Sequence, residues 1–283
     1  MALEHKARNA GRLSDILKNE MGVSSGLMNR LKWDERILVN GIPQRTNYPV
    51  QAGDTVSLML EEPEPEYPAQ DMDLTILYED SAILAADKPA GMLIHPSRSR
   101  DYDTFANGIL GHYRRNGEKS AFHPLTRLDR DTFGVVIVAK NSHIHALLQG
   151  SDVRKTYYAL VFGGPEADSG IIDAPIARRP LPSLLRYVDD SGKPSVTEYR
   201  VLRRFEGHTL LALTPITGRT HQLRVHCAHM GWPILGDPQY GTEASQAYSL
   251  ALGYTYQRLC AKEIRLTHPL TKEAMIIRSR LEP

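Results

Sequence analysis

The segment HPLTRLDRDTFGVVIVAK, residues 123–140, decides how this sequence is interpreted. Asp129 lies in it between Arg127 and Arg130, Asp131 follows, and a nearly continuous apolar run begins at Phe133. Such a run is typical of a buried strand, so the charges gather where a strand begins and a pocket can form. Nearby positive charge favours ionised Asp129, which could act as a nucleophile or stabilise a developing cation. An ordinary Arg–Asp ion pair explains the pattern equally well.

Composition indicates a soluble chain with a substantial core. Of its 283 residues 41% are hydrophobic, enough for one large domain plus a small one. No apolar stretch approaches the ~20 residues that span a bilayer, and residues 1–15 lack the apolar region of a signal peptide. The two cysteines, Cys227 and Cys260, are too few for a disulfide framework and suit a reducing compartment. We therefore expect a cytoplasmic protein with no membrane partner.

Charge and proline content divide the chain. Residues 61–74 hold six acidic residues and no basic one, and their three prolines discourage helix and sheet pairing. Residues 1–60 hold eight basic residues against six acidic, and residues 75–283 hold 26 against 21. We expect a small domain at residues 1–60, an acidic linker at 61–71 and a large domain at 72–283. Both mildly basic parts are compatible with RNA binding through local patches.

The small domain has the pattern of two helices followed by a hairpin. RLSDILKNE (12–20) and SSGLMNRLK (24–32) are amphipathic, with Ser24 or Ser25 as a helix cap. Asn40-Gly41 predicts a hairpin turn because both positions tolerate positive φ, and AGDTVSLML (52–60) alternates as a strand does. An unrelated small α+β domain is the alternative to the resemblance described next.

The motifs RLSDIL (12–17), VNG (39–41) and AGDTV (52–56) resemble, in this order, the S4-like RNA-binding module. One departure is that no basic residue opens the second helix. The resemblance implies RNA contacts by polar residues of this module, namely Arg12, Arg30, Lys32, Asn40 and Arg45.

The large domain is rich in strands without regular βαβ alternation, which favours an α+β fold with a mainly antiparallel or mixed sheet. Strands are expected within 74–80, 82–89, 134–140, 156–163, 197–205, 208–216 and 275–281. Helices are expected at 103–115, at 141–150 and at 219–230, where Gly231 and Pro233 act as stop signals.

Histidines and arginines cluster in TGRTHQLRVHCAHMGWPILGDPQYG, residues 217–241. On a helix one face would present Arg224 to a pocket, while the opposite face buries apolar groups. A zinc site is the alternative, but the spacing of its four possible ligands fits none of the standard pairs. Those ligands would be His221, His226, Cys227 and His229.

The segment KTYYALVFGG, residues 155–164, predicts a strand. Alternation places Tyr157 and Tyr158 on opposite faces, so at most one lines a given pocket. Simple packing explains both, because aromatic residues favour strands, but a pocket tyrosine can also stack on a base.

Five motifs in order are similar to the RluA-type family of RNA pseudouridine synthases. They are KPAGMLIHP (88–96), TRLDRDTFG (126–134), KTYYALVFG (155–163), the 218–241 segment beginning GRTHQLRVH, and LCAKEIRLTHP (259–269). The resemblance implies an α+β fold with a mixed, mainly antiparallel sheet flanked by helices and loops, often preceded by an S4-like module.

The same resemblance implies residue roles. Asp129 would be the catalytic carboxylate, Tyr157 would stack on the target uracil and assist proton handling, and Arg224 would hold Asp129 in place. Arg127 would help displace the target nucleotide, and Leu259 would form part of the apolar wall under the base.

Three positions depart from the family pattern. Thr126 replaces a usual His, Phe133 a usual Ser and Cys260 a frequent His. We expect them to alter the groove that faces RNA, and so the choice of substrate.

Isomerising uridine needs neither redox chemistry nor energy input, so no cofactor and no metal are expected, and no Gly-rich phosphate loop is found. A carboxylate can stabilise the cation-like sugar, as in glycoside hydrolysis, where a second carboxylate assists. Asp131 could be that second group, although a structural cap explains it better.

We expect the partner to be ribosomal RNA rather than transfer RNA, with no protein partner, and nothing demands more than a monomer. A non-catalytic RNA-binding protein and a hydrolase of small nucleosides are the alternatives.

Overall fold

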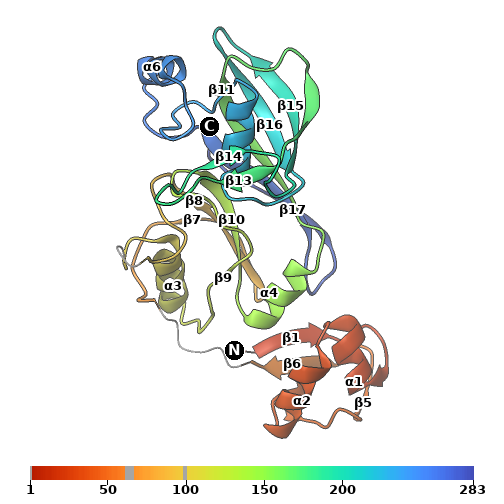
Figure 1. Cartoon of the computed structure of the whole chain (residues 1–283). Coiled ribbons are helices and arrows are strands. Elements are labelled where there is room, and N and C mark those ends of the chain that lie inside the picture. Colours follow the sequence, from red (N-terminus) through yellow and green to blue (C-terminus); the bar gives the residue numbers. More distant parts are fainter. Residues whose placement is uncertain (1, 61–66, 98–100) are drawn as a thin grey trace.

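The computed structural model describes residues 2–60, 67–97 and 101–283, so the predicted linker at 61–71 lies partly outside the described residues. Figure 1 shows a small body, residues 2–60, and a larger one formed by the rest of the chain. Among the described residues, no helix has the length and apolar character needed to cross a membrane.

The small body combines short helices with a four-stranded antiparallel sheet of order β1-β6-β3-β4. Its elements are β1 (Ala2–Lys6), β2 (Gly11–Arg12), α1 (Leu13–Asp15), the π-helical turn η1 (Ile16–Glu20), α2 (Ser25–Trp33), β3 (Ile37–Val39), β4 (Ile42–Pro43), β5 (Pro49–Val50) and β6 (Thr55–Met59).

The local predictions for this body are confirmed with one addition. The Ser24 hydroxyl accepts the Leu27 N–H (3.2 Å) and caps α2. Asn40 and Gly41 form the hairpin turn with φ of 50° and 79°. The first helix begins at Leu13 and becomes a π-helical turn after Asp15. Strand β1 was not expected, because pairing with β6 forms it rather than any local signal.

The large body is built on a ten-stranded sheet with the order β12-β15-β16-β11-β17-β10-β8-β7, to which β18 and β9 add at β17 and β10. The strands are β7 (Thr75–Glu79), β8 (Ile83–Lys88), β9 (His123–Pro124), β10 (Phe133–Ala139), β11 (Arg154–Phe162), β12 (Ser169–Asp173), β15 (Val196–Arg204), β16 (His208–Pro215), β17 (Leu259–Thr267) and β18 (Ala274–Arg278). A separate hairpin joins β13 (Ile176–Arg178) to β14 (Arg186–Val188).

One pair of strands in this sheet is parallel and the others are antiparallel, which confirms the expected mixed, mainly antiparallel α+β fold. The parallel pair is β10 and β17, where Phe133 lies opposite Cys260 and Gly134 opposite Ala261. Gly134 has a φ of 106°, and a Cβ there would lie 2.8 Å from the Ala261 nitrogen, so only glycine permits this close approach. Because the pair is parallel, the chain enters both strands at the same end of the sheet.

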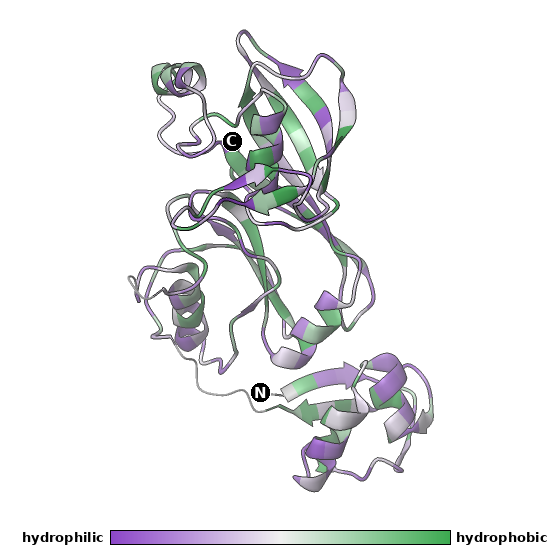
Figure 2. Ribbon diagram, in the orientation of Figure 1, coloured by the Kyte–Doolittle hydropathy of each residue, from purple (hydrophilic) through white to green (hydrophobic). Residues whose placement is uncertain are grey.

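Helices α3 (Phe105–Arg115), α4 (Ser142–Gln149) and α5 (Gln222–His229) pack on the sheet. Helix α6 (Glu243–Ala251) lies at the periphery of the large body (Figure 1). Apolar residues concentrate along the central strands (Figure 2). Phe105 of α3 packs against one side of β10, Ile144 of α4 packs against the other, and Leu223 of α5 packs against β11 and β16. Tyr157 contacts the core under α3 as well as the core under α5.

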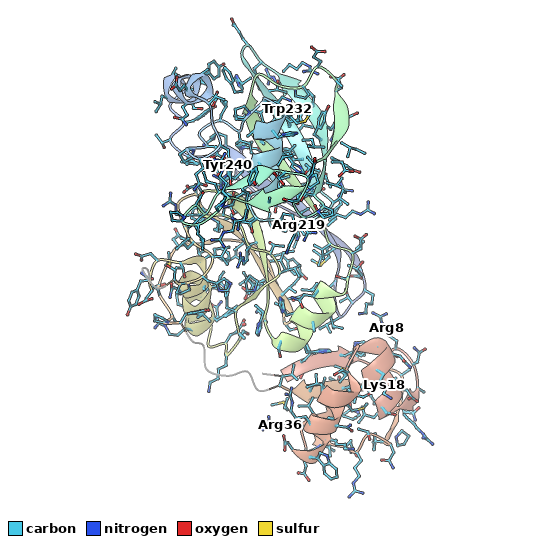
Figure 3. The ribbon with its side chains drawn as sticks, in the orientation of Figure 1. Arg8, Lys18, Arg36, Arg219, Trp232 and Tyr240 are labelled. Carbon is cyan, nitrogen blue, oxygen red and sulfur yellow. The ribbon has the colours of Figure 1, made fainter. Side chains whose placement is uncertain are left out.

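The small body docks on α4 and on the turn between β17 and β18. The His143 ring lies in hydrogen-bond contact with the Met21 carbonyl (3.0 Å), and the Arg8 guanidinium donates to the Thr271 carbonyl (2.6 Å). In Figure 3, Arg8, Lys18 and Arg36 lie on this small body, and Arg219, Trp232 and Tyr240 lie on the large one.

One sequence expectation for the large body is wrong, and six of its elements were not expected, namely β9, β12, β13, β14, β17 and α6. Helix α5 begins at Gln222 and not at residue 219, because His221 adopts a left-handed conformation (φ 59°) that a continuing helix excludes. The capping box of helix α6 at Thr242 and Ser245 is a local signal that the sequence carries.

Candidate active site

Asp129 lies in the loop that leads into β10, at the end of the sheet where β10 and β17 both begin. The Thr132 N–H donates to the Asp129 carbonyl (3.2 Å), and the Leu125 N–H donates to the carbonyl of Ile137 in β10 (2.8 Å). The Asp129 side chain is 31% exposed, so it reaches solvent while its backbone is held. The sequence places this carboxylate at a strand entrance, and the structure confirms that position.

Lys88, at the end of β8, holds the same loop in place through hydrogen bonds. It is fully buried, and its ammonium donates to the carbonyls of Pro89 (2.9 Å), Met92 (2.8 Å) and Arg130 (2.8 Å). Three acceptors match the three N–H groups of a protonated lysine. Burial lowers the pKa of Lys88 to about 7, against the opposing effect of Asp131 and Asp129. Lys88 thus ties the residue next to Asp129 to the central sheet.

Replacing Lys88 with methionine is expected to destabilise the protein by about 2–3 kcal/mol, because the buried ammonium's three hydrogen bonds to backbone carbonyls are lost. It is also expected to lower kcat, since the Arg130 carbonyl adjoins Asp129. Urea unfolding and a rate assay measure the two effects, and exposed Lys119→Met is the matched control, expected to shift stability by no more than about 0.5 kcal/mol. A Lys88→Met variant as stable and active as this control would contradict the role.

The Asp129 carboxylate pairs with Arg224 on the first turn of α5. Arg224 Nη1 donates to Asp129 Oδ2 (3.0 Å), while its Nε and Nη2 donate to the two oxygens of Asp237 (2.7 and 2.8 Å). Nη2 also donates to Gln239 Oε1 (2.8 Å). Asp237 is fully buried and the Arg224 side chain is 6% exposed. Its charge partners hold the pKa of Arg224 above the ordinary value despite burial, so a permanent cation faces Asp129.

Asp237 was not singled out from the sequence, although it lies in the quoted motif PILGDPQYG. It grips Arg224 in a bidentate pair, and it also accepts the backbone N–H groups of Gln239 (2.9 Å) and Tyr240 (3.2 Å). The loop after α5 therefore closes around the carboxylate that orients Arg224. An aspartate directly after a Gly and before a Pro is the sequence signal that could have identified it.

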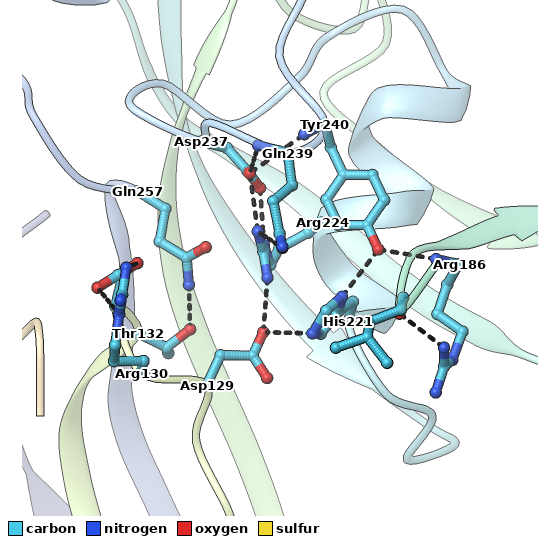
Figure 4. Close-up of polar contacts among 12 residues, drawn as sticks. Asp129, Arg130, Thr132, Arg186, His221, Arg224, Asp237, Gln239, Tyr240 and Gln257 are labelled. Carbon is cyan, nitrogen blue, oxygen red and sulfur yellow. Dashed lines mark hydrogen bonds and ion pairs between the residues drawn. The ribbon is translucent and has the colours of Figure 1, made fainter. Parts of the chain in front are cut away.

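His221, the residue before α5, completes the contacts of Asp129 (Figure 4). Its Nε2 lies 3.8 Å from Asp129 Oδ2, and its Nδ1 lies 2.8 Å from the Tyr240 hydroxyl. Burial lowers the pKa of His221, and the nearby Arg224 and Arg186 lower it further against the opposing effect of Asp129. The ring is therefore neutral at pH 7, and Arg224 supplies the cation of the site.

A cavity of about 510 Å³ opens beside this ion pair. Its lining includes Asp129 and Arg224, the partly buried Tyr157 of β11, the buried Leu259 of β17 and the exposed Arg127. This volume lies in the range of small-molecule sites. Burial, and secondly the charge of Asp129, raise the pKa of the Tyr157 hydroxyl, so it stays protonated throughout the physiological range. The cavity thus combines aromatic and aliphatic side chains with a carboxylate.

Of the ten site residues selected from the sequence, five line the same cavity and five lie elsewhere, on the small body. Asp129, Tyr157, Arg224, Arg127 and Leu259 all line the one cavity. The other five lie on the small body, where Arg12, Arg30, Lys32 and Arg45 are exposed. The side chain of Asn40 is occupied within that body: it donates to Asp54 (2.9 Å) and accepts the Thr55 N–H (2.9 Å).

The three departures from the family pattern do not all line the cavity. Thr126 lines the cavity. Phe133 and Cys260 are opposite each other in the parallel pair β10–β17 and are 4% and 0% exposed, so neither faces the groove. Phe133 packs instead under Arg258, whose guanidinium lies 5.7 Å from the ring. Of the three positions, only Thr126 therefore lines the cavity, and the expected effect of all three on substrate choice stays a prediction.

The zinc alternative is not supported by the part of the chain that the structure describes, where no cluster of three or more potential metal ligands is found. Three of the four side chains have separate surroundings. His221 faces Asp129, His226 contacts Thr197 and the Ala174 carbonyl, and Cys227 is buried in the core under α5.

An ion-paired carboxylate beside a cavity with apolar, aromatic and basic lining is an arrangement typical of the active site of an enzyme. The family model described as RNA pseudouridylate synthase matches residues 82–229. The chain belongs to this family, whose enzymes isomerise uridine in RNA to pseudouridine.

Individual relatives agree with this assignment. The chain is 39% identical to the ribosomal large subunit pseudouridine synthase D of Pseudomonas aeruginosa over 84% of this chain and 78% of that protein. It is 38% identical to an uncharacterized RNA pseudouridine synthase of Bacillus subtilis, over 85% and 80%. Among solved structures, human RNA pseudouridylate synthase domain containing 1 has a TM-score of 0.60 and 26% identity, covering 75% of this chain and 84% of that one.

Proposed function

We propose that this protein converts uridine to pseudouridine in the RNA of the large ribosomal subunit, with Asp129 as the catalytic carboxylate. The observation that carries the proposal is the Asp129–Arg224 pair in the lining of a cavity that Tyr157 and Leu259 also line. The names of the relatives favour ribosomal over transfer RNA. One chain supplies every proposed site residue, which supports action as a monomer, and two buried free cysteines support a cytoplasmic location.

The reaction breaks the bond between uracil N1 and the ribose C1′ and forms a bond between C5 and C1′. Asp129 is proposed to stabilise or trap the cation-like C1′ while the uracil turns, as a carboxylate does in glycoside hydrolysis. Arg224 holds that carboxylate in place through their ion pair. Tyr157 is proposed to stack on the uracil and assist proton handling, and its hydroxyl, whose pKa burial raises, can donate a hydrogen bond there. N1 gains a proton and C5 loses one, so the reaction is balanced without a co-reactant.

The substrate base must leave its stack to reach this cavity, at a cost of a few kcal/mol. The exposed Arg127 is proposed to displace the nucleotide and offset that cost. We further propose that residues 1–60 form an S4-like RNA-binding domain, joined by residues 61–71 to the catalytic domain at 72–283. The exposed Arg12, Arg30, Lys32 and Arg45 support such contacts. Asn40 is the weakest member of the set, because its amide is already hydrogen-bonded.

Release of tritium from RNA labelled at uridine C5 tests the proposed function, because forming the new bond expels that hydrogen. We expect release from a transcript of bacterial large-subunit ribosomal RNA, and none from labelled transfer RNA or free uridine. Release from free uridine would indicate an enzyme of small nucleosides. Binding of the ribosomal transcript without release would indicate a non-catalytic RNA-binding protein, and either result would overturn the proposal.

A further inference from the structure

A second cavity of about 630 Å³ adjoins the first at the Asp129–Arg224 pair. Asp129, Thr220, His221 and Arg224 line both cavities. The β13–β14 hairpin contributes Arg178 and Arg186 to the lining of this second cavity. Any chain that places a ribose at Asp129 in the first cavity can therefore continue directly into the second.

The second cavity carries positive charge that the protein does not neutralise. Arg130 at its edge is balanced by Asp131, whose two oxygens accept from Nε and Nη2 (both 3.0 Å). Arg224 pairs with two carboxylates, Asp129 and Asp237, so that group carries one net negative charge, which offsets only one of the two arginines of the hairpin. Among the described residues, Arg178 and Arg186 have no carboxylate partner. Arg186 Nη1 donates to the carbonyls of Leu184 (2.8 Å) and Leu185 (3.3 Å), and its Nε and Nη2 have no protein acceptor there.

The hairpin is fixed to the active site, so its charges have a defined place. The Arg186 N–H donates to the Tyr240 hydroxyl (3.0 Å), which is hydrogen-bonded to Nδ1 of His221 (2.8 Å), the residue beside Asp129 (Figure 4). Arg186 is close enough to His221 and Tyr240 to lower the pKa of both side chains, although burial leaves that of Tyr240 raised overall. Arg186 lines the second cavity, and its Nε and Nη2 have no acceptor among the described residues, so its guanidinium is available for a phosphate contact.

We propose that the second cavity binds the phosphodiester of the nucleotide next to the target uridine, with Arg186 and Arg178 as its ligands. This inference rests on the proposed function, because it takes the target ribose to lie at Asp129. The phosphate is covalently joined to that ribose, so its capture positions C1′ against the carboxylate. It also explains why a strand of RNA, and not a nucleoside, would be the substrate.

The salt dependence of RNA affinity tests the subsite. Each phosphate contact with single-stranded nucleic acid adds about 0.7 to the slope of log affinity against log salt concentration. In an Asp129→Asn background, where the RNA is not converted, we expect Arg178→Gln/Arg186→Gln to weaken binding of the large-subunit ribosomal RNA transcript. The slope is expected to fall by roughly 0.7, the value for one phosphate, because both arginines bind the same phosphodiester.

Two controls distinguish a phosphate contact from the nonspecific effect of removing positive charge and from a folding defect. Arg200→Gln removes an exposed arginine of β15 beside a cavity that shares no residue with the active site, and is expected to leave the slope unchanged. Arg178→Lys/Arg186→Lys retains the charge and is expected to retain most of the slope. A slope for the double Gln variant equal to that of Arg200→Gln would overturn the inference.

Tritium release separates this inference from the proposed function. With Asp129 present, the double Gln variant is expected to raise KM for the ribosomal transcript with little change in kcat. If wild-type protein releases no tritium but the slope falls as expected, the proposed function fails and the phosphate site stands. If wild-type protein is active and the slope does not change, the phosphate site fails alone.

Discussion

Replacing Asp129 with asparagine is expected to lower the rate of tritium release from uridine C5 by roughly 10⁴-fold or more, the scale of loss when a catalytic group is removed. Asparagine has the shape of aspartate but no charge, so it cannot stabilise or trap a cation-like C1′. RNA affinity is expected to change little, because Tyr157, Leu259 and Arg127 remain in the cavity lining. Single-turnover release and equilibrium binding measure the two quantities.

Asp131→Asn is the matched comparison for this experiment. Asp131 lies two residues away and is occupied by a bidentate pair with Arg130. We expect the Asp131 variant to keep most of the wild-type rate. Comparable losses in both variants would point to two cooperating carboxylates, and an active Asp129→Asn variant would remove Asp129 from the mechanism.

The second large effect is expected at Asp237, which never touches the substrate cavity. In Asp237→Asn, the new amide N–H group faces the Nε–H or Nη2–H donor of Arg224, and the buried guanidinium loses a charge partner. Removing one partner of a buried ion pair costs about 3–5 kcal/mol of unfolding free energy. A misplacement of catalytic groups by about 1 Å can also lower kcat by ~10²-fold. Both losses are expected together, because Arg224 links Asp237 to Asp129.

Urea unfolding and single-turnover rates measure these two losses. Asp152→Asn is the control, since Asp152 forms an exposed pair with Arg154 (3.3 Å) whose loss is expected to cost less than about 1 kcal/mol. An Asp237→Asn variant that is destabilised but fully active would assign Asp237 to stability alone. A variant with wild-type stability would contradict the buried pair itself.

Local signals in the sequence predicted much of this fold. The Asn40-Gly41 turn, the Ser24 cap and the apolar run at Phe133 act within a few residues, so their physics is visible in the chain itself. Strand β1 and the β13–β14 hairpin carry no comparable signal. The backbone groups of β1 pair with the distant strand β6, and those of β13 pair with β14. Neither pairing leaves a local pattern in the sequence, so these elements were not predicted.

The sequence by itself determined the residue types of the site: a carboxylate between arginines at a strand entrance, an arginine on a helix, and a tyrosine in a strand. Only the tertiary structure decided that they meet. Asp129 and Leu259 share one end of the sheet because β10 and β17 run parallel there, a register set by packing between segments over 120 residues apart. Asp237, Lys88 and Arg186 gain their roles in the same way, because charge and hydrogen bonding act through space and not along the chain.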